Sequence, residues 1–242
     1  MKPLIVLRTR DEELARITAM IRGLSVGHQP LKILEAGCGR RWPIDMGGIA
    51  FLLTGIDVDG EALAARKAGA GDLDKAIVGD LRTVSYPPQE FDVIYNAFVL
   101  EHISGAEQVL HQFDEWLKPG GVMILRLPDR NTVYGFTTRF TPFWFHVLFK
   151  KYVQGNRNAG KPGFEPYPTF YDQVVSREGI HEFARQHDLI VEEEYGLNTY
   201  LDGPGIIKKL MCFYVWSVGK LSLGKLSSNY NDLCMVLRKK PG

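Results

Sequence analysis

The stretch Ile33-Leu34-Glu35-Ala36-Gly37-Cys38-Gly39 decides the fold, because an apolar run here ends in an acid and two closely spaced glycines. This pattern predicts a buried strand that runs into a tight turn. Glycine has no Cβ, so the backbone of such a turn lets a ligand approach closely, and α/β proteins bind ligands at the carboxyl ends of their strands. Taken alone, the pattern fits equally well a turn that binds nothing.

The composition indicates a soluble globular protein with no general affinity for polyanions. The chain has 242 residues, of which 45% are hydrophobic and 24% charged, and it can bury a full core as one domain over 1–242. Its formal net charge is +1, so no nucleic-acid partner is expected.

The cysteines and the first residues of the chain predict a cytoplasmic location. The chain has three cysteines, an odd number, at Cys38, Cys212 and Cys234. They are widely spaced and none is paired with a histidine at metal-ligand spacing, which is typical of a reducing compartment. Asp11 and Glu12 stand where a signal peptide would be apolar.

Short apolar runs alternate with helical patterns along most of the chain. The predicted strands are 31–35, 50–56, 75–78, 91–96, 122–127, 189–195 and 231–238, and the predicted helices are 11–24, 61–68, 106–117 and 176–187. This alternation predicts an α/β fold with a mostly parallel sheet and right-handed crossovers. The helix 11–24 is expected over the sheet edge or as a lid beside the ligand. The crossover after Gly39 is too short for a full helix.

Two segments depart from this alternation. The segment 130–175 is rich in aromatic, Gly and Pro residues and reads as an insertion or lid over an acceptor pocket. Its aromatic residues suit an accessory core or a pocket for a sugar, a phosphate-bearing or an aromatic acceptor; they are Tyr134, Phe136, Phe140, Phe143, Trp144, Phe145, Tyr152, Phe164, Tyr167, Phe170 and Tyr171.

The second segment, 204–225, is apolar with flanking lysines and is too short at its core to span a bilayer. One interpretation is a buried helix that covers the sheet or the acceptor pocket. The other is an interfacial segment that makes a peripheral contact with the inner face of a membrane.

Polar residues follow four successive strands of the predicted sheet. They are Glu35, Asp57, Asp80 and Asn96. The carboxyl ends of parallel strands share one edge, so these side chains can line one crevice. Carboxylates there would accept hydrogen bonds from ribose hydroxyls and from an exocyclic amine.

In these features the sequence resembles the class I S-adenosylmethionine-dependent methyltransferases, in particular the methyltransferase type 11-like group. The resemblance covers 31–127. It is carried by Glu35-Ala36-Gly37-Cys38-Gly39, Gly55-Ile56-Asp57, Gly79-Asp80, Phe91 to Asn96, Val99-Leu100-Glu101-His102-Ile103 and Leu117-Lys118-Pro119-Gly120-Gly121. It implies a Rossmann-like methyltransferase fold with a seven-stranded sheet, helices on both faces and the aromatic-rich insertion after the fifth strand.

The resemblance also implies S-adenosylmethionine as the cofactor and assigns its contacts. The methionine part would lie on Glu35, Gly37, Cys38 and Gly39, with Asn96 near its end. Asp57, followed by Val58, would hold the ribose, and Asp80 with Leu81 would read the adenine.

Two departures from the family pattern bear on the site. Arg40-Arg41 follow Gly39 where a third glycine is frequent, so Arg40 or Trp42 is a candidate to face the cofactor or the substrate. Some relatives bind a divalent metal with Glu-x-x-Glu-His, but here Phe98 takes the first glutamate position, and no metal site is expected.

The expected activity is O-methylation of a small-molecule or glycan acceptor. A hydroxyl acceptor needs a general base, and His102 is the first candidate, ahead of His146, Tyr171 and Asp172. A backbone-bonded, purely structural His102 is the alternative. Other acceptors remain open, namely an amine, a carbon centre or a lipid-like quinone precursor, as does a non-catalytic cofactor-binding module on the same fold.

Overall fold

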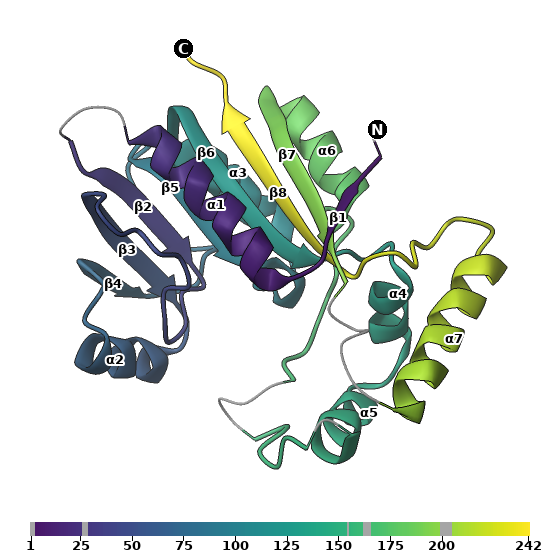
Figure 1. Cartoon of the computed structure of the whole chain (residues 1–242). Helices are drawn as coiled ribbons and strands as arrows, with labels where there is room; N and C mark the ends of the chain where they lie inside the picture. Colours follow the sequence, from purple (N-terminus) through teal and green to yellow (C-terminus); the bar gives the residue numbers. More distant parts are fainter. Residues whose placement is uncertain (1–2, 26–28, 154, 162–165, 199–204) are drawn as a thin grey trace.

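One mixed sheet runs through the computed structural model (Figure 1). The structure describes residues 3–25, 29–153, 155–161, 166–198 and 205–242, without the side chains of 153 and 206–208. In the described part the strands are β1 (Ile5–Leu7), β2 (Leu31–Ala36), β3 (Phe51–Asp57), β4 (Lys75–Val78), β5 (Phe91–Ala97), β6 (Leu117–Pro128), β7 (Leu189–Leu197) and β8 (Asp232–Lys239). Their order in the sheet is β1-β7-β8-β6-β5-β2-β3-β4.

The helices lie on both faces of the sheet and beyond its carboxyl edge. The α-helices are α1 (Arg10–Leu24), α2 (Gly60–Gly69), α3 (Ala106–Trp116), α4 (Val133–Phe140), α5 (Phe143–Leu148), α6 (Arg177–Gln186) and α7 (Ile206–Leu221). A 3₁₀ turn, η1 (Leu100–His102), precedes α3, and a π turn, η2 (Phe149–Val153), follows α5.

The predicted fold class is confirmed, with one strand more than expected. β8 is antiparallel to both β6 and β7, and the other neighbouring pairs are parallel. The additional strand is β1, which pairs with β7 through Ile5 with Tyr195 and Leu7 with Leu197. Three residues are too few to show a strand periodicity, so the sequence could not reveal β1.

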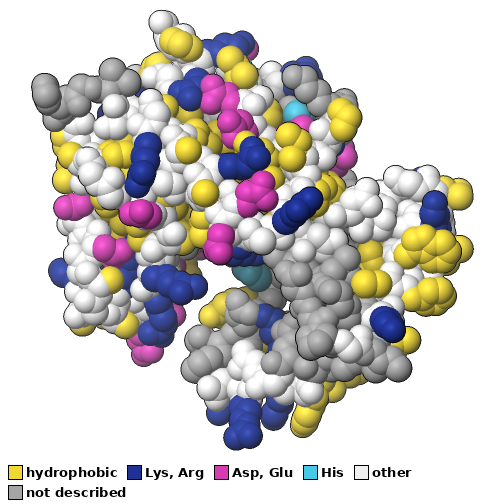
Figure 2. All heavy atoms as spheres, viewed as in Figure 1, with side chains coloured by type: hydrophobic (Ala, Val, Ile, Leu, Met, Phe, Trp, Pro, Cys, Tyr) yellow, Lys and Arg dark blue, Asp and Glu magenta, His cyan; other side chains and the backbone are white. Residues whose placement is uncertain are grey.

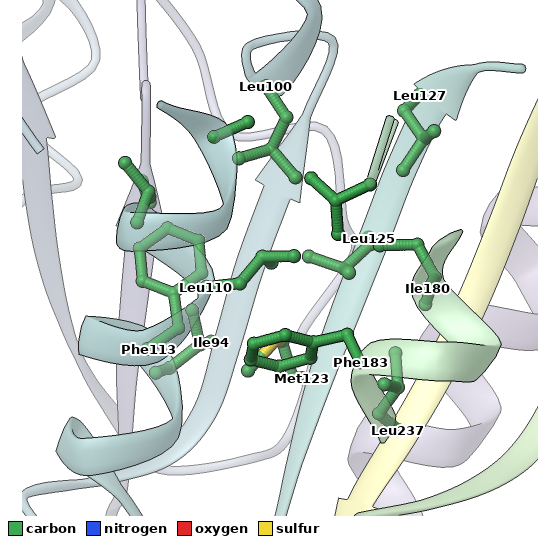
Figure 3. Close-up of a cluster of buried hydrophobic side chains, with 14 of the residues drawn as sticks. Ile94, Leu100, Leu110, Phe113, Met123, Leu125, Leu127, Ile180, Phe183 and Leu237 are labelled. Atoms are coloured by element: carbon green, nitrogen blue, oxygen red, sulfur yellow. The ribbon is translucent and has the colours of Figure 1, made fainter. Parts of the chain in front are cut away.

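Helices α3 and α6 cover one face of the sheet. The apolar positions of α3 recur every three to four residues, which places Val109, Leu110, Phe113 and Trp116 on one side of the helix. Figure 3 shows Leu110 and Phe113 meeting Ile94, Met123 and Leu125 from the strands, beside Ile180 and Phe183 of α6. This packing holds the strands in place, and with them the carboxyl edge of the sheet.

Helix α1 lies across the opposite face, and it neither caps the sheet edge nor forms a lid. Ile17 and Ile21 are fully buried in a second core cluster with residues of β2, β5, β6 and β8. Glu13 of the same helix pairs with Arg126 of β6 at 2.5 Å, and both side chains are buried. The charged pair ties α1 to the middle of the sheet because neither partner can be left alone without water.

The first crossover contains no helix among the described residues, as expected from its glycines. The chain passes from Gly37 to Ala50 as turns and loop before β3 begins. The end of β2 lies beside the end of β3, because the two strands pair in parallel from Leu31 with Phe51 to Ala36 with Ile56.

The insertion and α7 form a layer beyond the carboxyl edge of the sheet (Figure 1). A bridge between Thr132 and Ser227 and a 2.8 Å hydrogen bond between the hydroxyls of Thr137 and Tyr214 join α4 to the α7 region. None of the described side chains of α7 is buried, which contradicts a helix buried against the sheet. Phe164 and residue 204 of the predicted segments lie outside the described residues.

Within the described part of the chain, no helix has the length and apolar character needed to cross a membrane.

Candidate active site

The turn after β2 depends on both of its glycines. Gly37 has φ +74° and Gly39 has φ +53°, the left-handed region that favours glycine. A Cβ on Gly37 would lie 2.2 Å from Cγ2 of Val99, whereas a Cβ on Gly39 would meet open space. Gly37 therefore allows the segment 98–102 to close against the turn, and the space next to Gly39 is open.

The carboxylate of Asp57 holds the same turn from the end of β3. One oxygen accepts a hydrogen bond from the backbone N–H of Gly39 at 2.8 Å, and the other accepts one from the N–H of Asp59 at 2.9 Å. Carboxylate oxygens accept more than one bond each, so capacity for a ribose hydroxyl remains. Val58 follows with 70% of its surface exposed and offers an apolar surface beside the turn.

Glu35 belongs to a buried ion-pair network that the sequence analysis missed. Its partner is Arg66 of α2, fully buried, with Nη1 at 2.7 Å from the Glu35 carboxylate. Arg66 also donates to the carbonyl of Cys38 at 2.8 Å and to Asp72 at 2.9 and 3.0 Å. Burial raises the pKa of Glu35 to about 8, and the guanidinium opposes that rise. Through Arg66, the network holds the Cys38 carbonyl of the glycine turn in place.

The signal that could have revealed Arg66 is its place on the helix. It lies three and four residues after Leu63 and Ala62, which α2 buries on the same side. Arginine at an apolar helical position predicts a buried acidic partner. Cys38 is also buried, which raises the pKa of its thiol to about 12, so its backbone and not its sulfur serves the turn.

The three remaining predicted cofactor residues take different positions. Arg82 donates a forked pair of hydrogen bonds to Asp80, which holds the pKa of that carboxyl below its usual range. Leu81 is buried in the core. Asn96 is buried too, and its amide donates to the carbonyl of Ala36 at 2.9 Å, locking the end of β5 to the end of β2. Asp80 thus stands just after the carboxyl end of β4, while the side chains of Leu81 and Asn96 are buried inside the protein.

Of the two residues proposed to mark the departure from the family, Trp42 has a packing role. Its ring meets the ring of Tyr95 edge-on, with 5.4 Å between the centroids, against the second core cluster. Arg40 is exposed.

A cavity of about 910 Å³ lies on the other side of the segment 98–102. Its wall combines that segment with the insertion, with α7 and with the start of β8. The lining includes Arg10, Phe98, Glu101, His102, Phe145, His146, Phe149, Tyr171, Met211, Tyr214, Val215 and Asp232. Since Val99 touches the glycine turn, the two sites share one short segment.

His102 is held in the cavity wall in a defined orientation. Its Nδ1 lies 2.7 Å from the carbonyl oxygen of Pro168, and its ring meets that of Tyr167 edge-on at 5.8 Å. A carbonyl can only accept, so Nδ1 carries the proton in this contact and Nε2 is the basic nitrogen of the neutral ring. Nε2 lies 3.8 Å from a carboxylate oxygen of Glu101, which would stabilise the ring once it is protonated.

Glu101 and Asp232 form an acidic end of the cavity that the sequence analysis did not predict. Only 3% of Glu101 is exposed, and its Oε2 has no hydrogen-bond partner among the described residues. Burial raises the pKa of Glu101 to about 8 and that of Asp232 to about 6. Arg10 pairs with Asp232 at 3.0 Å. These groups come from α1, η1 and β8, so only the fold could bring them together.

Phe98 sits in an unusual backbone conformation with its ring between two arginines. Its φ is +58°, and the guanidinium carbons of Arg10 and Arg126 lie 5.0 and 5.2 Å from the ring centroid. Non-glycine residues in this region cost roughly 1–3 kcal/mol, and they cluster at functional sites. Two cations thus lie close to the Phe98 ring. Nowhere in the described part do three or more His, Cys, Asp or Glu side chains gather to hold a metal ion.

The alternative bases separate into two groups. His146 and Tyr171 line the cavity, where burial lowers the pKa of His146 and raises that of Tyr171. Asp172 does not line it. Its Oδ2 accepts from the N–H groups of Gly105 and Ala106 at 2.7 and 2.9 Å, so it caps α3 and is no candidate base.

Comparison with known proteins agrees with this geometry. Residues 34–125 match the protein family described as a methyltransferase domain. A probable S-adenosylmethionine-dependent methyltransferase of Mycolicibacterium smegmatis is 32% identical over 174 residues, 71% of this chain and 66% of the relative. Phosphoethanolamine N-methyltransferase 1 of Zea mays is 31% identical over 105 residues, 39% of this chain and 20% of the relative. The chain thus spans 66% or less of the length of these two relatives.

Solved structures share the fold along nearly the whole chain. An S-adenosylmethionine-dependent methyltransferase from Archaeoglobus fulgidus superposes with a TM-score of 0.52 at 15% identity, covering 96% of this chain and 95% of that one. With the glycine turn, the acid after β3 and the strand order in place, the sequence match identifies the chain as a member of the class I S-adenosylmethionine-dependent methyltransferases, whose cofactor is S-adenosylmethionine.

Proposed function

We propose that the protein transfers a methyl group from S-adenosylmethionine to a hydroxyl of a small-molecule or glycan acceptor bound in the 910 Å³ cavity. The observation that carries this proposal is the orientation of His102, whose Nδ1 contact with Pro168 leaves Nε2 as the basic nitrogen in the cavity wall. The cavity has the size of a small-molecule site, since such sites range from about 300 to 1,000 Å³.

The residues of the crevice suit the cofactor. A Cβ would fit at position 39 without contact, so the backbone there is open to the methionine part. Asp57 accepts hydrogen bonds and would hold the ribose hydroxyls, while exposed Val58 would cover the adenine and Asp80 would accept its amine. When bound, the cofactor supplies an electrophilic methyl group on a positively charged sulfur.

In the reaction the chain's own task is positioning and proton removal. The cavity holds the acceptor with its hydroxyl toward His102, and Nε2 takes the hydroxyl proton as the oxygen–carbon bond forms and the carbon–sulfur bond breaks. Glu101, 3.8 Å from Nε2, stabilises the resulting imidazolium once it is itself ionised, above its pKa of about 8. The apolar side chains of the insertion and α7 exclude water from the acceptor.

His102→Gln tests the base role. A general base contributes about 10²- to 10⁴-fold, so methyl transfer to hydroxyl acceptors in a screen should fall by that factor. Calorimetric affinity for S-adenosylhomocysteine should not change. His146→Gln is the matched control, because His146 lines the same cavity but is held by Thr141. An unchanged rate in His102→Gln rules out the base role.

A second candidate is transfer to an amine, which the acidic end of the cavity favours. Glu101 and Asp232 could bind a protonated amine, and a relative from Zea mays is named a phosphoethanolamine N-methyltransferase. The same screen separates the hydroxyl and amine candidates. A deprotonated amine attacks through its own lone pair and does not need His102 as a base, whereas a hydroxyl must lose its proton. Amine turnover that survives His102→Gln but not Glu101→Gln would replace the hydroxyl proposal.

A further inference from the structure

The layer beyond the sheet edge exposes large apolar side chains on one side of α7. Leu210, Phe213, Trp216 and Leu221 recur at intervals of three to five residues, and none of the four lines the cavity. Their exposure is high, with 66% for Phe213, 58% for Trp216 and 82% for Leu221. We call these four residues, with Lys209 and Lys220 beside them, the outer face of α7.

The opposite side of the same helix faces inward. Met211 and Val215 are half-buried and line the cavity with Tyr214. The helix therefore has an interior side that accounts for its packing, and the outer face is additional apolar surface with no packing role among the described residues. Figure 2 shows hydrophobic side chains gathered over α7, with Lys and Arg among them.

A second group of exposed large apolar residues lies on α5 and η2. It consists of Phe143, Trp144, Phe145, Leu148 and Tyr152. Phe145 and Phe149 contribute to the cavity wall that α7 also forms, so both groups belong to the same layer around the cavity.

Charge in this layer is segregated by sign. The sequence contains no Asp or Glu in 130–161 or in 203–231, although the whole chain holds 28 acidic and 29 basic residues. The basic residues of the two segments are Arg130, Arg139, Lys150, Lys151, Arg157, Lys161, Lys208, Lys209, Lys220 and Lys225. The rest of the chain is accordingly acidic, and this layer is its basic end.

We infer that this layer docks on the surface of an anionic lipid bilayer, with the outer face of α7 in the headgroup region. Tryptophan on an apolar helical side and lysines near the two ends of the helix are suited to that region, and anionic headgroups attract the lysines. A second copy of the chain is a poorer occupant, because it would bring lysine against lysine. The inference does not depend on the proposed reaction.

Vesicle sedimentation tests the inference. The protein should pellet with vesicles of phosphatidylcholine containing phosphatidylglycerol, less with phosphatidylcholine alone, and less as salt increases. Phe213→Ser with Trp216→Ser should weaken binding about tenfold or more, since two large apolar groups no longer enter the interface. Both positions are exposed, so the fold and the affinity for S-adenosylhomocysteine should be retained.

Matched variants elsewhere on the surface control for general effects. Leu52→Ser with Ile190→Ser changes exposed apolar residues of β3 and β7 and should leave binding unchanged. Lys220→Glu with Lys225→Glu should weaken binding, while Lys67→Glu with Lys240→Glu should have no comparable effect.

Tryptophan fluorescence gives an independent readout. Trp144 and Trp216 are exposed, Trp42 is half-buried and Trp116 is buried. Anionic vesicles should shift the emission to shorter wavelength, and the shift should be smaller in Trp216→Phe. Three results would overturn the inference: no pelleting, equal pelleting of the Phe213→Ser/Trp216→Ser protein, or a dimer in gel filtration that this variant dissociates.

Discussion

Two glycines of the same turn differ in what surrounds them, and this difference is testable at the scale of single residues. Gly37→Ala must adopt left-handed φ and also push against Val99, whereas Gly39→Ala meets only the backbone cost. That cost is about 1–2 kcal/mol of unfolding free energy. Gly37→Ala should lower the free energy of unfolding by more than this amount, as measured by urea denaturation. Equal losses in the two variants would mean that Val99 moves aside freely.

Asp57 is the residue whose removal should affect the cofactor most directly. Asp57→Ala deletes the proposed acceptor for the ribose and releases the N–H of Gly39. Hydrogen bonds to charged groups are worth about 1.5–3 kcal/mol, so affinity for S-adenosylhomocysteine should fall at least about tenfold in calorimetry. Asp45→Ala, at an exposed carboxylate of the first crossover, is the control. Unchanged affinity in Asp57→Ala would reject the assignment.

At this scale the sequence predicted those residues that follow strands and missed those that depend on the fold. Asp57 could be found because the carboxyl ends of parallel strands meet at one edge. Arg66 and Asp232 could not, because their partners stand on elements far apart in the sequence. Asn96 was found at the right edge, but its amide is used inside the protein.

Among the elements, α3 takes its cap from a distant part of the chain. Asp172, near the end of the insertion, accepts hydrogen bonds from Gly105 and Ala106. Asp172→Ala should lower the free energy of unfolding by about 0.5–2 kcal/mol, the usual cost of losing a cap. Asp172→Asn keeps an oxygen acceptor and should recover most of the loss in urea denaturation. If Ala and Asn behaved alike, the cap would not be what links the insertion to α3.

Element positions were predictable where packing imposes a period. The strands β2 and β5 and the helix α3 each bury a regular apolar pattern, and the structure places them within one or two residues of the prediction. For α7 the apolar composition predicted a helix-sized segment but not its burial. Which side of a helix meets the protein depends on neighbours that composition does not specify.

For the molecule as a whole, buried carboxyl groups set the pH dependence of stability. Glu101 has a folded pKa of about 8, above the ordinary value of 4.5, so the folded protein keeps a proton that the unfolded chain has lost. Stability is therefore greatest below the ordinary pKa and falls as pH rises toward 8. For each proton that only the folded protein retains, the free energy of unfolding falls by about 1.4 kcal/mol for every unit by which the pH rises.

Glu101→Gln removes this proton and should flatten the decline between pH 5 and pH 8 in urea denaturation. Glu61→Gln, on the exposed first turn of α2, is the control and should keep the wild-type profile. A Glu101→Gln profile as steep as the wild-type profile would show that Glu101 is ionised in the folded protein.

The position of β8 between β6 and β7 determines what should happen if the last strand is lost. β6 and β7 have no contact as neighbours in the sheet except through β8, which also delivers Asp232 to the cavity. A chain cut before Asp232 would leave two long strands with unpaired edges inside a hydrophobic core. Such edges pair readily with other chains, so loss of the last strand should yield aggregates and not a smaller enzyme.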